Sequence, residues 1–255
     1  MLKKSSPLLA LVLISGLMSG CSSSSSKPTI PDEPPEVLFQ QAQLQLDSGN
    51  YEKAVEVLEA LDSRYPFGPY SNQVQLDLIY AYYKNADTAQ AIANIDRFIR
   101  LNPAHPDIDY VFYMRGLTNM QADYNFFQSV LGMDRFDRDP AYARQAFADL
   151  KRVLVSYPNS KYAADARSRL VYLKDRLSRY DLAVADFYMR RKAWLSAANR
   201  GKYLLETYPD TPAVQPALEI MIKAYDKLEM PTLAEHARQV LATNYPNDSL
   251  ARKSS

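Results

Sequence analysis

The sequence contains almost no cysteine and very little glycine: one cysteine and 7 glycines occur in 255 residues. With Cys21 alone, no internal disulfide can form, so the fold cannot depend on one. No GxGxxG motif or other phosphate-cradling loop is present, which argues against a nucleotide-binding fold. The formal net charge is only +1, so no overall electrostatic field favours nucleic acid or an acidic surface as a partner.

Catalytic motifs are missing as well. The sequence has no HExxH and no GxSxG, which removes two common signatures of hydrolases. The two histidines, His105 and His236, lie far apart and each falls in a turn or a repeat helix. The carboxylates follow a helical surface pattern, in which partners lie four residues away. We therefore expect no catalytic residue, no metal and no cofactor.

The one long apolar run, residues 8–18, follows Lys3 and Lys4 and falls well short of the roughly 20 residues that span a bilayer. It leads into Leu17-Met18-Ser19-Gly20-Cys21, which resembles a bacterial lipobox. We expect residues 1–20 to be a signal peptide that is removed on export. Cys21 is then the lipidated first residue of the mature protein, which makes the protein anchored to a membrane rather than spanning it.

Residues 21–35 combine a serine run with four prolines. Such a segment is extended and cannot form a core, so we expect a tether between the lipid and the folded part. Ser22 beside the cysteine is, by analogy with enterobacterial lipoproteins, compatible with transfer to the outer membrane.

The rest of the chain carries a recurring signature, an alanine 12 residues before a proline with an apolar residue seven positions after the alanine. The five copies are Ala54/Leu61/Pro66, Ala91/Phe98/Pro103, Ala146/Val153/Pro158, Ala197/Leu204/Pro209 and Ala234/Leu241/Pro246. In each copy a small and a bulky residue share one helix face, and the proline ends the helix. Self-similarity at a period near 34 residues is typical of tetratricopeptide (TPR) repeats, helix pairs that bury their apolar faces by stacking.

We therefore predict an all-α TPR-type solenoid of five repeats and 10 or 11 helices. Repeats one and two occupy residues 36–103, repeats three to five occupy residues 104–246, and residues 247–255 form a C-terminal tail. The clearest helices are expected at 36–47, 51–64, 71–84 and 88–101. The TPR packing positions of first helices are filled by Leu78/Ile79/Tyr82, Val184/Ala185/Tyr188 and Met221/Ile222/Tyr225.

Repeat three departs from this spacing. Its first helix is expected at about 108–121, and about 18 residues near 122–140 are inserted before the second. Within the insert, residues 132–140 alternate acid and base, so a self-paired loop in which Asp139-Pro140 caps the next helix is favoured over a calcium loop. A further helix, 160–177, is expected to extend repeat three and can run on into repeat four.

Aromatic residues gather around Gly68-Pro69. The chain has 19 tyrosines, and the gathered residues are Tyr65, Phe67, Tyr70, Tyr80, Tyr82 and Tyr83. Tyrosine combines an apolar body with a polar tip, which suits a peptide-binding groove. The same residues also suit packing positions, so core and groove both remain open for this cluster.

Several segments of the chain resemble the BamD family of outer-membrane lipoproteins. The segments that carry the resemblance are Tyr65-Pro66-Phe67-Gly68-Pro69-Tyr70-Ser71, residues 74–87, residues 95–103, Tyr113-Met114-Arg115-Gly116-Leu117-Thr118, the Asp134-Arg135 and Asp137–Pro140 pieces, and residues 169–177. The resemblance covers nearly the whole chain, from the lipobox to repeat five.

The resemblance implies an outer-membrane lipoprotein that faces the periplasm, carries out no reaction and belongs to the β-barrel assembly machine. In that family the C-terminal repeats bind a POTRA domain of the barrel subunit BamA, other Bam lipoproteins are also contacted, and the N-terminal repeats receive the β-signal peptides of unfolded outer-membrane proteins. On this chain it assigns signal binding to Tyr65, Phe67, Gly68 and Tyr70, and BamA binding to Asn199 and Arg200. No nucleic-acid partner is implied.

Two other classes of protein share parts of the pattern. A periplasmic TPR adaptor for cell-wall or envelope assembly would share the repeats and the signal but lack the Arg64–Tyr70 block. A cell-wall lytic enzyme on a helical superhelix would need a separate catalytic domain, for which the five repeats leave no room in residues 36–246. A binding scaffold is therefore the favoured interpretation.

Overall fold

The computed structural model describes residues 30–128 and 139–251, with the backbone alone at 125–128. The chain divides between Pro34 and Pro35, and every helix among these described residues belongs to the second unit. The described part contains ten α-helices and no strand. Their bounds are α1 Pro35–Asp47, α2 Tyr51–Arg64, α3 Ser71–Lys84, α4 Thr88–Leu101, α5 Ile108–Gln128, α6 Ala141–Ser156, α7 Ala163–Arg190, α8 Trp194–Thr207, α9 Val214–Lys227 and α10 Pro231–Asn244.

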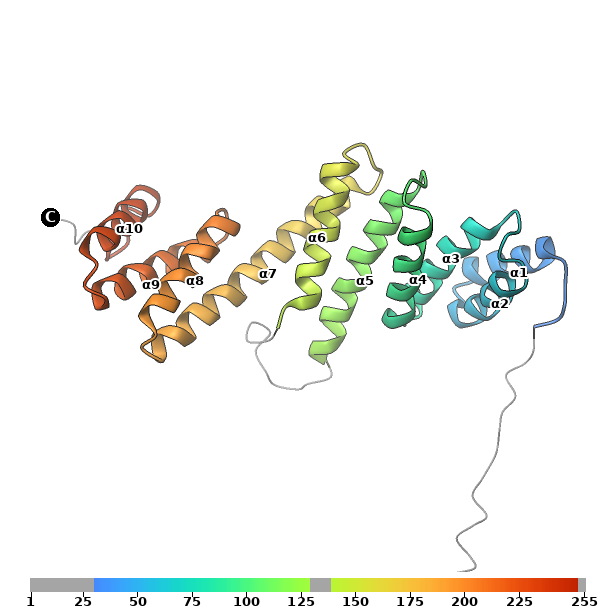
Figure 1. Cartoon of the computed structure of the whole chain (residues 1–255), viewed down its shortest axis with the longest axis horizontal. Helices are drawn as coiled ribbons and strands as arrows, with labels where there is room; N and C mark the ends of the chain where they lie inside the picture. Colours follow the sequence, from blue (N-terminus) through green and yellow to red (C-terminus); the bar gives the residue numbers. More distant parts are fainter. Residues whose placement is uncertain (1–29, 129–138, 252–255) are drawn as a thin grey trace, which may run out of the picture. The chain divides into compact units, whose positions relative to one another are not determined.

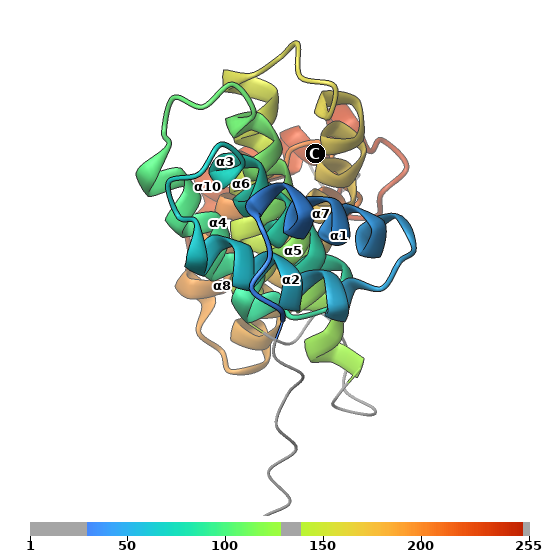
Figure 2. The same cartoon turned by 90° about the vertical axis from the view of Figure 1, so that its right-hand side faces the viewer.

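The ten helices form five successive hairpins that stack in chain order. Each helix packs against the one before and the one after it, and α7 also contacts α9. Figure 1 shows this order from α1 to α10, and Figure 2 shows the same helices from the α1 and α2 end. This arrangement confirms the predicted all-α repeat fold.

The repeat signature is the core of the stack. All five signature alanines are fully buried at 0%, and the five apolar residues seven positions later are exposed by at most 2%. The small side chain lets the neighbouring helix approach, while the bulky one fills the space between helices. The predicted TPR packing residues Leu78, Ile79 and Tyr82 are buried as well.

Each tyrosine of the four Tyr-Pro pairs caps the C-terminus of a helix. Tyr65, Tyr157, Tyr208 and Tyr245 follow α2, α6, α8 and α10, and each backbone N–H donates to the carbonyl four residues earlier. The residue before a proline is disfavoured in the helical region, so the helix ends there. The second helix of a repeat is therefore stopped by local sequence alone.

The turns inside the hairpins have a different design. Gly49, Ala86, Lys192 and Glu229 follow α1, α3, α7 and α9, and their φ angles lie between 56° and 74°. The next backbone N–H reaches back to a carbonyl five residues earlier, for example from Asp87 to Tyr82 at 3.0 Å. This left-handed helix ending is usually made by glycine, but only the first of these turns has one.

Four sequence-based expectations need correction. The first helix begins at Pro35, one residue earlier than expected, because proline is well suited to a helix start. Helix α5 continues to Gln128, so the expected insert begins as helix. Asp139 makes no capping hydrogen bond to α6, because Pro140 occupies the N-cap position.

The fourth correction concerns the start of the helix expected at 160–177, which begins at Ala163. Its continuation into repeat four, which the sequence left open, is confirmed, because α7 runs on to Arg190. Repeats three and four thus share one unbroken helix. The predicted signal peptide, Cys21 and residues 129–138 of the insert lie outside the described residues. Among those that are described, no helix has the length and apolarity to cross a membrane.

Close packing of α5 against α6 depends on Gly116. A Cβ at this position would lie 2.6 Å from Leu150 Cδ2 on α6. Gly116→Ala should therefore lower the free energy of unfolding by about 1–2 kcal/mol, because overpacking outweighs the gain in helix propensity. Urea unfolding followed by circular dichroism measures this change. A variant that is more stable than the unmodified protein would mean that Leu150 moves aside without cost.

Candidate functional site

The turn between α2 and α3 holds the four residues assigned to signal binding. Two backbone hydrogen bonds shape it, from Gly68 N to Tyr65 O at 3.0 Å and from Ser71 N to Gly68 O at 3.1 Å. A Cβ on Gly68 would lie 3.2 Å from the Tyr65 carbonyl oxygen, so the turn closes tightly over that carbonyl. We call residues 65–70 the N-terminal turn.

The structure gives the side chains of the N-terminal turn different environments. Phe67 is 98% exposed, whereas Tyr70 stacks on Phe39 of α1 with ring centroids 4.5 Å apart and planes 9° apart. The crevice behind the turn, lined by Tyr65, Gly68 and Tyr70 among others, has only about 200 Å³ of empty space and no room for a water molecule. The crevice therefore leaves no space for a ligand, whereas the Phe67 side chain is open to one.

The question of core or groove for the other tyrosines is resolved residue by residue. Tyr82 is buried and its hydroxyl donates to Glu59 Oε1 at 2.5 Å. Tyr80 is 36% exposed and lies edge-on to Tyr51 at 6.0 Å, with the Lys84 ammonium over both rings. Tyr83 packs against the core. The aromatic gathering thus serves packing more than recognition.

The second predicted pair, Asn199 and Arg200, lies on α8, the second helix of repeat four. Asn199 is exposed. Leu195 and Tyr203, four residues before and after it, are exposed by 54% and 44%, so the three side chains share one helix face. With Arg200 beside them, we call Leu195, Asn199, Arg200 and Tyr203 the α8 face.

Arg200 is tied to the preceding helix. Its Nη1 donates to Asp181 Oδ1 of α7 at 2.9 Å, and 31% of the arginine side chain is exposed. Burial raises the pKa of the Asp181 carboxyl, although the nearby guanidinium groups of Arg200 and Arg144 act in the opposite direction. The guanidinium carbon of Arg200 also lies 5.8 Å from the Tyr203 ring centroid.

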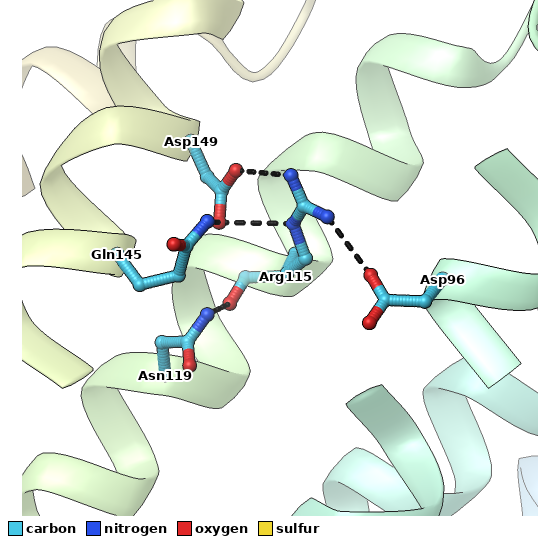
Figure 3. Close-up of polar contacts among 5 residues, drawn as sticks. All are labelled: Asp96, Arg115, Asn119, Gln145 and Asp149. Carbon is cyan, nitrogen blue, oxygen red and sulfur yellow. Dashed lines mark hydrogen bonds and ion pairs between the residues drawn. The ribbon is translucent and has the colours of Figure 1, made fainter. Parts of the chain in front are cut away.

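Repeats two and three are joined by a charge cluster that the sequence did not indicate. As Figure 3 shows, Arg115 of α5 lies between Asp149 of α6 and Asp96 of α4. It binds Asp149 through two hydrogen bonds of 3.0 and 2.7 Å and Asp96 through one of 2.9 Å. Gln145 also donates to Asp149, and Asn119 donates to the Arg115 carbonyl oxygen. These groups satisfy one another's hydrogen-bonding capacity, so the cluster holds α4, α5 and α6 together.

Burial of Arg115 lowers its pKa, but the hydrogen bonds and charges of Asp149 and Asp96 outweigh this effect and raise it above its usual range. Its guanidinium therefore stays charged and is held by the two carboxylates, as expected of a structural ion pair.

An open groove lies between α7 and α9, and the sequence pattern does not indicate it. It has a volume of about 640 Å³, and its apolar lining residues include Leu182, Pro216 and Ile220. Lys223 at its rim pairs with Glu219 at 3.2 Å. The first helices of repeats four and five meet here, far apart in the sequence, so no local motif marks the groove.

No group of three potential metal ligands occurs in the described residues. His105 Nδ1 accepts a hydrogen bond from the Asp107 backbone N–H at 3.1 Å, and the His105 ring packs edge-on against Phe98. His236 is exposed on α10. Each histidine therefore occupies an ordinary position in the repeats.

The stacked hairpins, the internally paired charges and the exposed side chains on a turn and a helix face define a helical-repeat protein of the kind that binds other proteins. Residues 31–241 match the family YfiO, described as outer membrane lipoprotein. The chain belongs to this family. Together with the relatives below, this match confirms the predicted resemblance to the BamD family of outer-membrane lipoproteins.

Its relatives carry a common name. A protein of Vibrio cholerae serotype O1 named outer membrane protein assembly factor BamD is 54% identical over 239 residues, covering 94% of this chain and 97% of that protein. The proteins of the same name from Neisseria meningitidis serogroup B and Xylella fastidiosa Temecula1 are 42% and 39% identical, over 86% and 94% of this chain and 82% of each relative. A solved assembly chaperone of RpL4 (Acl4) covers 86% of this chain and 93% of its own at 13% identity, but the TM-score of 0.31 is too low to bear on the fold.

Proposed function

We propose that this chain is an assembly factor for outer-membrane proteins and acts as a binding scaffold without catalysis. The relatives named BamD, of which this chain covers most of the length, support the assembly role. Lipidated Cys21 would anchor it to the outer membrane on the periplasmic side, and residues 21–35 would hold the repeats away from the lipid. Two acyl chains or more are needed for firm anchoring.

The observation that carries the proposal is the separation of two exposed surfaces on one repeat stack. Phe67 stands out from the N-terminal turn in repeats one and two, while the α8 face lies in repeat four. We assign the N-terminal turn to the aromatic-ended β-signal peptide of an unfolded outer-membrane protein. We assign the α8 face to the POTRA domain of the barrel-forming subunit BamA, with repeats three to five also contacting other lipoproteins of the complex.

Such a scaffold works by effective concentration. If one chain holds both the substrate segment and the barrel-forming subunit, the second encounter becomes intramolecular and needs no new contact. The envelope adaptor for cell-wall assembly, the other interpretation of the sequence, is disfavoured because the relatives are named for outer membrane protein assembly.

Arg200→Ala tests the assignment of the α8 face. We expect the amount of barrel-forming subunit that co-purifies with the full-length protein to fall about tenfold, as for a central interface arginine. Quantitative mass spectrometry of the eluate measures this ratio.

A matched control is Arg97→Ala. Arg97 is 38% exposed and pairs with the Asp62 carboxylate at 2.6 Å, but it lies on α4 in repeat two. The control should leave the yield of the barrel-forming subunit unchanged. Equal yields with Arg200→Ala and Arg97→Ala would remove the α8 face from the proposed function.

A further inference from the structure

Asp181 is a buried carboxylate beneath the α8 face that the proposed function leaves unused. It is 1% exposed, and its Oδ1 accepts the hydrogen bond from Arg200 Nη1 at 2.9 Å. The positive charge of Arg144, on α6, also lies close enough to act on its pKa. Groups from three successive helices, α6, α7 and α8, therefore meet at this carboxylate.

Burying this carboxylate in its ionised form carries a cost for the folded state. Burial raises the pKa of Asp181 despite Arg200 and Arg144. An acid whose pKa is higher in the folded than in the unfolded protein loses stabilisation as pH rises through that folded pKa. Above that pKa its ionisation therefore opposes folding, and a buried ion pair of this kind is weak evidence for a stabilising role.

The hydrogen bond from Arg200 to Asp181 instead suits a role in orienting the Arg200 guanidinium. A guanidinium has five N–H donors in a rigid plane, and Asp181 binds it at Nη1. With 31% of its side chain exposed, Arg200 can present further donors to a partner. The Tyr203 ring, 5.8 Å away, gives the guanidinium a second support, so its orientation is set before a partner arrives.

We propose that Asp181 is a positioning residue for partner docking, which holds the Arg200 guanidinium in the orientation that the partner meets on the α8 face. The proposal rests on the proposed function, since it requires Arg200 to contact the barrel-forming subunit. Asp181 lies on α7 and is buried, so it would determine the contact on α8 without touching the partner.

The experiment compares Asp181→Asn, Arg200→Ala and the double variant in the full-length protein. The probe is the detergent-solubilised barrel-forming subunit, and the dissociation constant is measured by biolayer interferometry. We expect each single variant to weaken binding about tenfold and the double variant to bind no more weakly than Arg200→Ala alone, because residues that act through one contact are not additive. The thermal midpoint of Asp181→Asn should change by less than about 4 °C.

The matched control is Asp165→Asn. Asp165 lies on the same helix, α7, and its carboxylate pairs with Arg169 at 2.5 Å. This variant should bind like the unmodified protein. If Asp181→Asn binds like this control while Arg200→Ala is weakened, the positioning role is wrong and the proposed function stands. If the effects of Asp181→Asn and Arg200→Ala add, Asp181 does not act through Arg200. If Arg200→Ala has no effect, the α8 face itself is wrong.

Arg200→Lys gives a second measurement that leaves Asp181 intact in case Asp181→Asn folds poorly. Lysine keeps the charge but lacks the planar fork that Asp181 can orient. Binding as weak as that of Arg200→Ala supports the positioning role, whereas binding equal to that of the unmodified protein overturns it.

Discussion

Asp149→Ala should lower the free energy of unfolding by about 3–5 kcal/mol, the usual cost of removing one partner of a buried ion pair. Asp149 is 3% exposed and takes two of the three hydrogen bonds that Arg115 donates to carboxylates. Without it, the Arg115 guanidinium remains largely buried, because only 19% of that side chain is exposed. Urea unfolding followed by circular dichroism gives the difference.

Asp96→Ala is the matched control, since it removes the other carboxylate of the same arginine. Asp96 is 49% exposed, and an ion pair with an exposed partner contributes about 1 kcal/mol or less. The account of the clamp between repeats two and three is contradicted if Asp149→Ala proves no more destabilising than Asp96→Ala.

Phe67→Ala should weaken binding of a peptide that ends in an aromatic residue by about thirtyfold, the effect of losing one hot-spot aromatic side chain. The structural reason is that Phe67 is 98% exposed on a turn whose backbone is fixed by hydrogen bonds. A side chain with so little contact contributes almost nothing to folding, so the unfolding midpoint should not change. Fluorescence anisotropy of a labelled peptide measures the affinity.

Phe187→Ala serves as the control for this variant, because Phe187 is also an exposed phenylalanine, at 44%, but lies on α7. Peptide affinity should be unaffected by it. Normal affinity in Phe67→Ala would show that the N-terminal turn does not bind the peptide through this ring. Variants of Tyr65 and Gly68 would then test whether the turn takes part at all.

The repeat fold could be predicted because its determinants are local. An alanine, an apolar residue on the same helix face and a Tyr-Pro stop occur within 13 residues in repeat one, from Ala54 to Pro66, and all act within one helix. The turns inside the hairpins were harder to predict from the sequence. Ala86, Lys192 and Glu229 adopt the left-handed conformation without glycine, so nothing in their identity indicates it.

The candidate sites were predictable only in part, because burial and distant partners are not visible in a local pattern. The sequence placed Tyr70 with Phe67, yet Tyr70 stacks on Phe39 from another helix. The family resemblance assigned Arg200 to a partner contact, but the ion pair of Arg200 is made with a residue 19 positions earlier. The partners of Arg115 lie 19 and 34 positions away, a spacing set by how the hairpins stack.

The most direct test of the central claim is affinity purification of the full-length, lipidated protein from detergent-solubilised envelopes, with mass spectrometry of what co-elutes. The account predicts that the barrel-forming subunit BamA and other lipoproteins of its complex elute with the protein in a constant ratio. Elution with cell-wall synthesis proteins in place of the barrel-forming subunit would contradict it.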